Sequence, residues 1–243
     1  MGTGQWDDRV KQTMCQNYHS LNFKRPLILA SSSPRRQYLM REAGFHFTVK
    51  VPDIDESFPS EMPVHKVPKY LAEKKARVFE SHLTDEIVIS SDTVVILNNE
   101  ILNKPLHRQE AIEMLSRLSG HTHTVITAVC LLSKEKMDCF DDHTEVTFKK
   151  LTLEEINFYV DNYKPYDKAG AYGAQDCLPA GVNPCSNEEI QFLKQIGKSE
   201  LIEKTFTVTQ AGIGLVAIEK INGSYFTVMG MPIHQAYSHL LNF

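Results

Sequence analysis

Residues 86–97 read EIVISSDTVVIL, which places a polar segment inside an otherwise apolar run. The β-branched residues on either side predict a strand that is buried on both faces, as is usual for the central strands of an α/β sheet. Ser90, Ser91, Asp92 and Thr93 interrupt this run. A carboxylate inside a buried strand is costly unless it is paired with a cation or bound to a metal. We therefore predict a central strand that carries a functional aspartate; a turn at a strand end is the alternative explanation of Asp92.

Strands and helices alternate on both sides of this segment. Further strands are predicted at residues 27–30, 47–51, 122–132, 142–149, 214–218 and 224–229, and helices at residues 35–43, 64–81, 108–118, 153–162 and from about 232. Asn98 and Asn99 in the stretch ILNNEIL predict a hairpin with a type I′ turn. The alternation, with some strands paired as hairpins, predicts an α/β fold with a mixed sheet.

The chain has 243 residues, enough for one large domain or two small ones. Residues 1–24 are predicted to be an N-terminal extension, either a short surface helix or a partly ordered tail. Residues 25–243 are predicted to form a single domain with an insertion at about residues 177–206. Prolines and glycines break the alternation in this insertion, and the pattern EEIQFLKQI predicts a short helix within it.

Composition excludes several classes of function. The net charge of −4 gives no global basic field, so we expect no nucleic-acid partner. No apolar run approaches the roughly 18 residues that span a bilayer, and the first residues lack the order of a signal peptide, so we expect no membrane partner and a cytoplasmic location. Five cysteines without a CxxC motif predict neither a zinc site nor a disulfide framework. We interpret His121 and His123 as a loop or strand-surface pair, not as a metal site.

The loop after the first predicted strand is rich in serine and arginine. Residues 29–36 read LASSSPRR, and Pro34 suits the first turn of a helix. Hydroxyl groups, free backbone N–H groups and two guanidinium groups at a helix N-terminus favour an anion such as phosphate. A helix start capped by serine, with two surface arginines, is the alternative.

Acidic and basic residues elsewhere suit a metal-bound phosphate ligand. Glu56, in the acidic loop PDIDES, could join Asp92 as a ligand of Mg²⁺, which takes one or two carboxylates together with waters and substrate phosphates. The same loop could equally be a solvated acidic surface. Lys75 and Lys104 are candidate partners of a polyphosphate, although a single lysine is most often a solvated surface residue. Chemistry alone thus indicates a Mg²⁺-dependent enzyme or binder of a phosphorylated small molecule.

The chain resembles the Maf family of nucleoside triphosphate pyrophosphatases, historically named septum-formation inhibitors. The motifs that carry the resemblance occur in the family's order: LASSSPRR, IDES, LAEKKA, SSDTVV, NKP, LSGHTH and DKAGAYGAQ. The resemblance implies an elongated, twisted mixed sheet flanked by helices around a central cleft, similar to inosine triphosphate pyrophosphatases. It also implies a homodimer and a divalent metal cofactor, Mg²⁺ in the first place, with Mn²⁺ or Co²⁺ as alternatives.

The resemblance also implies roles for single residues. Asp92 matches the catalytic base or metal-binding acid, and Glu56 matches the second acidic residue near the metal. Ser31 and Arg36 match groups that hold the phosphates. Lys75 and Lys104 match lysines that face the triphosphate.

Three further positions imply the substrate. The family branch that prefers dTTP and UTP has the residues found here as Arg35, Thr93 and Gln175, and an amide can both donate to and accept from the O4 and N3–H edge of thymine or uracil. Asn103 and Asp176 depart from the family, which usually has glycine at both places. The resemblance implies hydrolysis of dTTP and UTP to the monophosphate and pyrophosphate. A nucleotide-binding regulator of septum formation and a 7-methyl-GTP pyrophosphatase are the alternatives.

Overall fold

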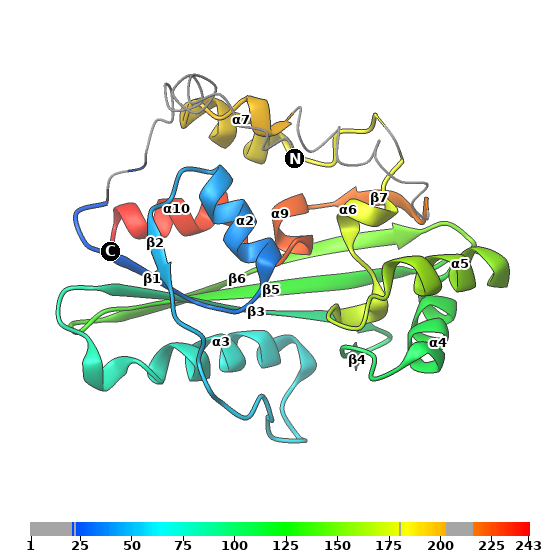
Figure 1. Ribbon diagram of the computed structural model, residues 1–243, viewed down its shortest axis with the longest axis horizontal. Coiled ribbons are helices and arrows are strands. Elements are labelled where there is room, and N and C mark those ends of the chain that lie inside the picture. The colour runs from blue at the N-terminus through cyan, green and yellow to red at the C-terminus, as the bar shows by residue number, and fades with distance from the viewer. Residues whose placement is uncertain (1–20, 22, 180, 203–215) are drawn as a thin grey trace, which may run out of the picture.

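The computed structural model describes residues 21, 23–179, 181–202 and 216–243. Its strands form a seven-stranded mixed sheet in the order β2-β1-β3-β5-β6-β7, with β4 paired to β3 (Figure 1). β1 runs parallel to β2 and β3, and the other neighbouring strands are antiparallel. The mixed sheet with its flanking helices confirms the predicted fold class. The strands are β1 (Leu27–Ala30), β2 (Phe47–Val49), β3 (Ile87–Leu97), β4 (Glu100–Leu102), β5 (Thr122–Leu132), β6 (Met137–Phe148) and β7 (Ile218–Asn222).

Helices cover both faces of the sheet. In Figure 1, α3 lies on one face, α2, α9 and α10 lie on the other with α7 beyond α10, and α4 and α5 stand at one end. In the described part of the chain, no helix combines the length and apolar character needed to cross a membrane. The helices are α2 (Pro34–Glu42), α3 (Val67–Arg77), α4 (Arg108–Leu118), α5 (Leu153–Tyr163), α6 (Ala174–Cys177), α7 (Asn187–Gln195), α9 (Tyr225–Val228) and α10 (Ile233–Leu241), with the 3₁₀ turns η1 (Val64–Lys66), η2 (Glu80–His82) and η3 (Ala169–Ala171).

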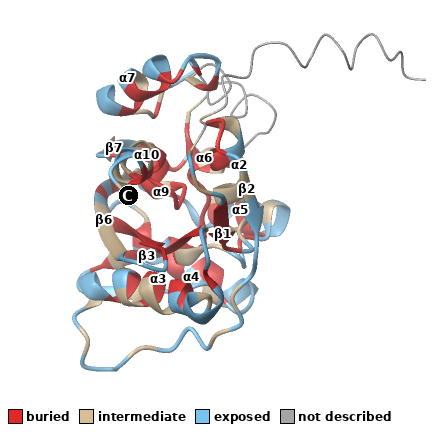
Figure 2. Ribbon diagram, turned by 90° about the vertical axis from the view of Figure 1, so that its left-hand side faces the viewer, coloured by how far each residue is buried: buried red, intermediate tan, exposed pale blue. Residues whose placement is uncertain are grey.

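The apolar core lies on both sides of the central strands. On the α3 side, Ala72 and Ala76 pack against a cluster that includes Val88, Ala128 and Leu132. The larger cluster lies on the opposite side, under α2, α9 and α10. Figure 2 shows the buried residues along the sheet and on the helix sides that face it. Because side chains alternate along a strand, β3 sends one set of side chains toward α3 and the next set toward α9.

One edge of β3 is open in the middle. β1 pairs with β3 only as far as Ala30 opposite Ser90, and on the same edge β4 begins to pair at Val95. Residues 91–94 therefore lie in a gap between two neighbouring strands. The predicted hairpin that closes this gap on the far side is confirmed, because Asn98 and Asn99 have φ angles of 53° and 62° as a type I′ turn requires.

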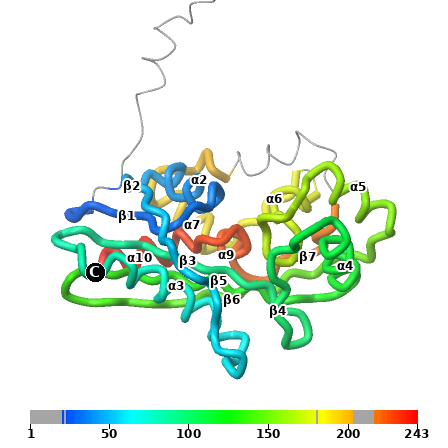
Figure 3. The backbone as a smooth tube through the Cα atoms, turned by 60° about the horizontal axis from the view of Figure 1, so that its bottom comes forward, coloured from blue at the N-terminus to red at the C-terminus, as the bar shows by residue number. Residues whose placement is uncertain are grey.

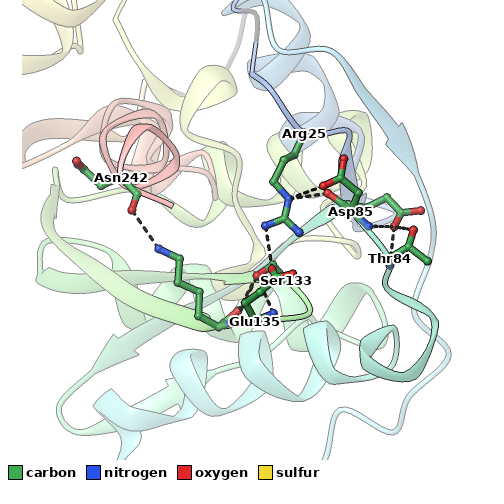
Figure 4. A network of polar contacts seen from close by, with 8 residues as sticks. Arg25, Thr84, Asp85, Ser133, Glu135 and Asn242 are labelled. Carbon is green, nitrogen blue, oxygen red and sulfur yellow. Dashed lines mark hydrogen bonds and ion pairs between the residues drawn. The ribbon is translucent and has the colours of Figure 1, made fainter.

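A polar network fixes the opposite end of β1 (Figure 4). The Nε atom of Arg25 donates to the carbonyl oxygen of Asp85 at 2.6 Å, and its Nη1 atom donates to Glu135 Oε2 at 3.0 Å. Lys136 Nζ donates to the carbonyl oxygen of Asn242 at 3.1 Å. The residues that precede β1 and β3 are thereby tied to the β5–β6 hairpin and to the C-terminal end of the chain.

Several sequence predictions are corrected near the C-terminus. Residues 224–229 form the helix α9 instead of a strand, because the Ser224 hydroxyl accepts a hydrogen bond from Thr227 N–H at 3.0 Å and caps the segment. β6 begins at Met137, before the predicted residue 142. β7 begins at Ile218, where the strand predicted at residues 214–218 ends; residues 214 and 215 lie outside the described residues, as does most of the predicted extension.

The structure contains a disulfide, although the sequence predicted no disulfide framework. Cys130 of β5 and Cys139 of β6 are joined, with Cα atoms 4.1 Å apart. The two residues lie directly opposite each other in the register of these strands. Their spacing in the sequence gave no sign of the pairing, because they become neighbours only through the register of the long β5–β6 hairpin.

The helix predicted inside the insertion is confirmed as α7. Its residue Glu189 is fully buried. Within the described residues, the Glu189 carboxylate accepts four hydrogen bonds: from Ser186 N at 2.7 Å, Ser224 Oγ at 2.6 Å, Tyr225 N at 3.1 Å and Phe226 N at 2.7 Å. Three of these donors lie at the start of α9. A negative charge at a helix start is favourable, so Glu189 links the insertion to α9.

We predict that Glu189→Gln lowers the free energy of unfolding by about 2–4 kcal/mol, because the new amide nitrogen would face two donors in a buried site. Glu188→Gln is the matched control, since Glu188 lies on the same helix but is exposed, and its cost should stay below about 0.5 kcal/mol. Urea denaturation of both variants measures the difference. Equal stability of the two variants would contradict the assigned role of Glu189.

His121 and His123 differ from the expected surface pair. His121 is exposed, with Nδ1 2.8 Å from the carbonyl oxygen of Ser119, whereas His123 is buried with an exposed fraction of 2%. His123 Nε2 lies 2.8 Å from the hydroxyl of Tyr172, and its ring packs edge-on against Phe148. Burial lowers the pKa of His123 to about 4.

This lowered pKa predicts a loss of stability in acid. Between the unfolded pKa of about 6.5 and the folded pKa of about 4, only the unfolded chain binds the proton. Stability should therefore fall as the pH drops through this window, by roughly 3 kcal/mol from His123 alone. Denaturation of the wild type and of His123→Gln from pH 8 to pH 4.5 tests this, with the pH 8 values giving the packing cost of the substitution. Parallel profiles would refute it.

Candidate active site

A cavity of about 440 Å³ opens at the gap beside β3. Its wall combines the start of α2, the segment after β2, the middle of β3 and the loop that leads into α6. Every residue that the sequence predicted for the site lines this cavity: Ser31, Arg35, Arg36, Glu56, Lys75, Asp92, Thr93, Lys104 and Gln175. Their placement together agrees with one ligand site, while the role of each residue stays a prediction.

The wall of the cavity includes a cluster of opposite charges. Lys75 points from the sheet-facing side of α3, and Asp92 points toward α3 from β3. The Lys75 Nζ atom lies 2.6 Å from Asp92 Oδ1 and 2.8 Å from Glu56 Oε1. Lys104 Nζ is 3.7 Å from Glu56 Oε2. Figure 3 shows the segment that carries Glu56 running from β2 past the sheet toward α3.

The two carboxylates of this cluster have different environments. Burial raises the pKa of Asp92 above its ordinary value, and the charges of Lys75 and Arg36 only partly oppose this. Burial also acts to raise the pKa of Glu56, but the hydrogen bond and charge of Lys75 prevail and lower it. The Glu56 side chain is half exposed, whereas Asp92 is almost fully buried. Asp92 is thus the carboxylate better suited to take up a proton.

Hydrogen bonds from all three guanidinium nitrogen atoms hold the Arg36 side chain in place. Nε donates to the carbonyl oxygen of Gly230 at 2.8 Å, Nη2 to Thr93 Oγ1 at 3.0 Å, and Nη1 to Ser31 Oγ at 3.4 Å. Burial lowers the pKa of Arg36, and nearby Asp92 opposes this. The guanidinium group is therefore a fixed positive charge at the wall of the cavity.

The N-terminus of α2 is not capped by a serine side chain. Ser33 occupies the N-cap position, but its side chain makes no capping hydrogen bond. Instead, the Ser33 N–H donates to Ser31 Oγ at 3.2 Å. The alternative interpretation of this loop as an ordinary serine-capped helix start is therefore unsupported, and the three serines line the cavity.

The loop before α6 forms the other end of the cavity. Arg35 Nη1 lies 3.1 Å from Asp167 Oδ2, and Lys168 Nζ lies 2.7 Å from Asp167 Oδ1. The Oε1 atom of Gln175 is buried and has no hydrogen-bond partner within the described residues. The sequence predicted no site role for Asp167 or Lys168, although both belong to the motif DKAGAYGAQ.

The acidic residues fit a metal ion that arrives with a phosphorylated ligand. Among the described residues, no group of three or more His, Cys, Asp and Glu side chains could hold a metal. Glu56 and Asp92 each contact Lys75 through one oxygen, and the second oxygen of Glu56 lies 3.7 Å from Lys104 Nζ. Two carboxylates completed by waters and phosphate oxygens are a usual Mg²⁺ donor set.

The α/β fold thus carries a cavity lined by arginine, lysine and serine residues, a composition that suits a phosphorylated small molecule. The family model described as Maf-like protein matches residues 26–188. The chain belongs to this family.

Curated relatives match over most of the chain. A Bacteroides fragilis protein named dTTP/UTP pyrophosphatase is 39% identical over 216 residues, which cover 88% of this chain and 94% of the relative. Proteins of the same name from Flavobacterium psychrophilum and Parabacteroides distasonis are 39% and 37% identical, and the matches cover 89% and 90% of this chain and 93% and 97% of the relatives. The Staphylococcus aureus Ham1 protein shows a partial structural likeness, with a TM-score of 0.37, 14% identity and coverage of 51% of this chain and 71% of that one.

Proposed function

We propose that this protein hydrolyses dTTP and UTP to the nucleoside monophosphate and pyrophosphate. The observation that carries the proposal is the buried Asp92, paired with Lys75 in a cavity that Arg36 and Lys104 also line. The family membership and the names of the relatives agree with this chemistry. A cavity of about 440 Å³ also suits a ligand of nucleotide size.

The basic residues would bind the triphosphate and stabilise the leaving group. Arg36, Lys75 and Lys104 neutralise the charge that builds on pyrophosphate as the bond between the α-phosphorus and its bridging oxygen breaks. Ser31 donates its hydroxyl to a phosphate oxygen. Because hydrogen bonds already fix the Arg36 guanidinium, little reorganisation is needed when substrate enters.

Asp92 would act on the attacking water. Its raised pKa suits a general base that accepts a proton as the water oxygen attacks the α-phosphorus. Glu56, with its lowered pKa, stays ionised and holds Lys75 from the other side. When Mg²⁺ is bound by Glu56 and Asp92, it supplies further neutralisation of the phosphate oxygens.

The far end of the cavity would select the base. The Gln175 amide can accept from N3–H and donate to O4 of uracil or thymine. Arg35 and Thr93 would complete the selection, and Asp167 holds Arg35 in position. We further propose that the protein acts as a cytoplasmic homodimer, with no nucleic-acid or membrane partner.

The proposed substrate predicts a selective activity. With Mg²⁺, pyrophosphate release should be strong from dTTP and UTP and weak from CTP, ATP, GTP and 7-methyl-GTP. Gln175→Glu should lower the rate on dTTP by at least about tenfold, because a carboxylate cannot donate to O4. Preference for another nucleotide would overturn the assignment of Gln175, Arg35 and Thr93. No release from any nucleotide, with dTTP still bound, would favour a regulator of septum formation.

Asp92→Asn should separate binding from chemistry. The amide cannot accept the proton, so kcat should fall by at least about 100-fold, while dTTP binding measured by calorimetry stays within about threefold. Asp53→Asn, an exposed residue of the same acidic loop as Glu56, should keep normal turnover. Full turnover by Asp92→Asn would remove Asp92 from the mechanism.

A further inference from the structure

Arg36 is attached to α9 by two separate routes. The first is direct, from Arg36 Nε to the carbonyl oxygen of Gly230, just beyond the end of α9. The second passes through two hydroxyl groups. Arg36 Nη2 donates to Thr93 Oγ1 at 3.0 Å, Thr93 Oγ1 lies 2.9 Å from Thr127 Oγ1, and Thr127 Oγ1 donates to the carbonyl oxygen of Thr227 at 2.7 Å.

The donor and the acceptor of each hydrogen bond in the second route follow from the number of hydroxyl protons that are present. A carbonyl oxygen only accepts, so Thr127 gives its single hydroxyl proton to Thr227. Thr93 must then donate its own proton to Thr127. The lone pairs of Thr93 Oγ1 are thereby left for the guanidinium group of Arg36. Thr127 is the residue that makes Thr93 an acceptor toward Arg36.

We propose that Thr127 is a positioning residue for Arg36. The proposal rests on the phosphate-binding role given to Arg36 above. Thr127 is fully buried on β5 and is absent from the cavity wall, so it acts through Thr93 and Arg36 and not on substrate. Without the Thr127 hydroxyl, the Thr93 hydroxyl loses its hydrogen-bond acceptor. Its proton can then point toward the Arg36 guanidinium group, which is also a donor, and the hydrogen bond between Arg36 and Thr93 is weakened.

The Thr127 network also explains why two threonines face each other in the core. Thr93 and Thr127 are paired across β3 and β5, at the point where the edge of β3 is open. Val94 and Ile126, the next pair in the register, fill an apolar cluster. The buried hydroxyl of Thr127 would be unfavourable in that setting without partners, and the route from Arg36 to α9 gives partners to both threonine hydroxyls.

Thr127→Val tests the proposal, because valine has nearly the same shape and lacks the hydroxyl. We expect kcat with dTTP to fall about tenfold, with KM changed by less than about threefold, since Arg36 acts on charge that builds in the transition state. Thr127→Ser keeps the hydroxyl and should restore kcat to within about twofold of the wild type. Rates are taken per folded protein, measured by thermal denaturation of each sample.

Thr144→Val is the matched control. Thr144 is also buried, and its hydroxyl donates to the carbonyl oxygen of Ser224 at 3.1 Å, at the other end of α9, without a bond to Arg36 or Thr93. It should lower the melting temperature as Thr127→Val does but leave kcat within about twofold. An equal loss of kcat in the two variants would overturn the specific role of Thr127, as would failure of Thr127→Ser to restore activity.

A double-mutant cycle with Arg36→Ala separates this proposal from the proposed function. If Thr127 acts through Arg36, then Thr127→Val should lower kcat by less than about twofold in the Arg36→Ala background. A further tenfold loss there would refute the positioning role while leaving Arg36 in the mechanism. Normal turnover by Arg36→Ala alone would instead refute the phosphate-binding role of Arg36.

Discussion

The ion pair between Asp92 and Lys75 is the constraint on which the site depends. Both groups are almost fully buried, so neither charge has enough water to stabilise it. Each therefore requires the other, and the 2.6 Å contact fixes the distance between α3 and β3. Glu56 adds a third charge from the segment after β2. This charge cluster thus joins α3, β3 and the segment after β2 at the wall of the cavity.

The gap in the sheet makes this cluster accessible. If β1 continued beyond Ala30, it would cover the edge of β3 where Asp92 and Thr93 lie. Instead the chain leaves the sheet at Ser31 and turns into α2, which brings Arg36 to the same edge. Side chains from both faces of β3 reach the cavity there, so Asp92 meets Lys75 of α3 while the adjacent Thr93 meets Arg36 of α2.

The sequence predicts the elements whose signals are local. Asp92 stands out because a carboxylate in an apolar strand needs a partner, and Asn98 with Asn99 prescribes one type of turn. The pairings that depend on tertiary register were missed. Nothing local pairs Cys130 with Cys139, and Tyr225 and Phe226 have the residue types of a strand although a serine cap makes them helical. Asp167 was missed because its role depends on Arg35, which is remote in the sequence.

Helix α9 connects the insertion to the wall of the cavity. The family match ends at residue 188, and the next residue, Glu189, gives its carboxylate to the first backbone N–H groups of α9. The far end of the same helix leads to Gly230, whose carbonyl oxygen accepts from Arg36. A helix of one turn has little stability of its own, so its position depends on the groups bound at its ends. The hydrogen bonds of Glu189 and Arg36 therefore hold α9 at its two ends, and this helix connects Glu189 of the inserted segment to the wall of the cavity.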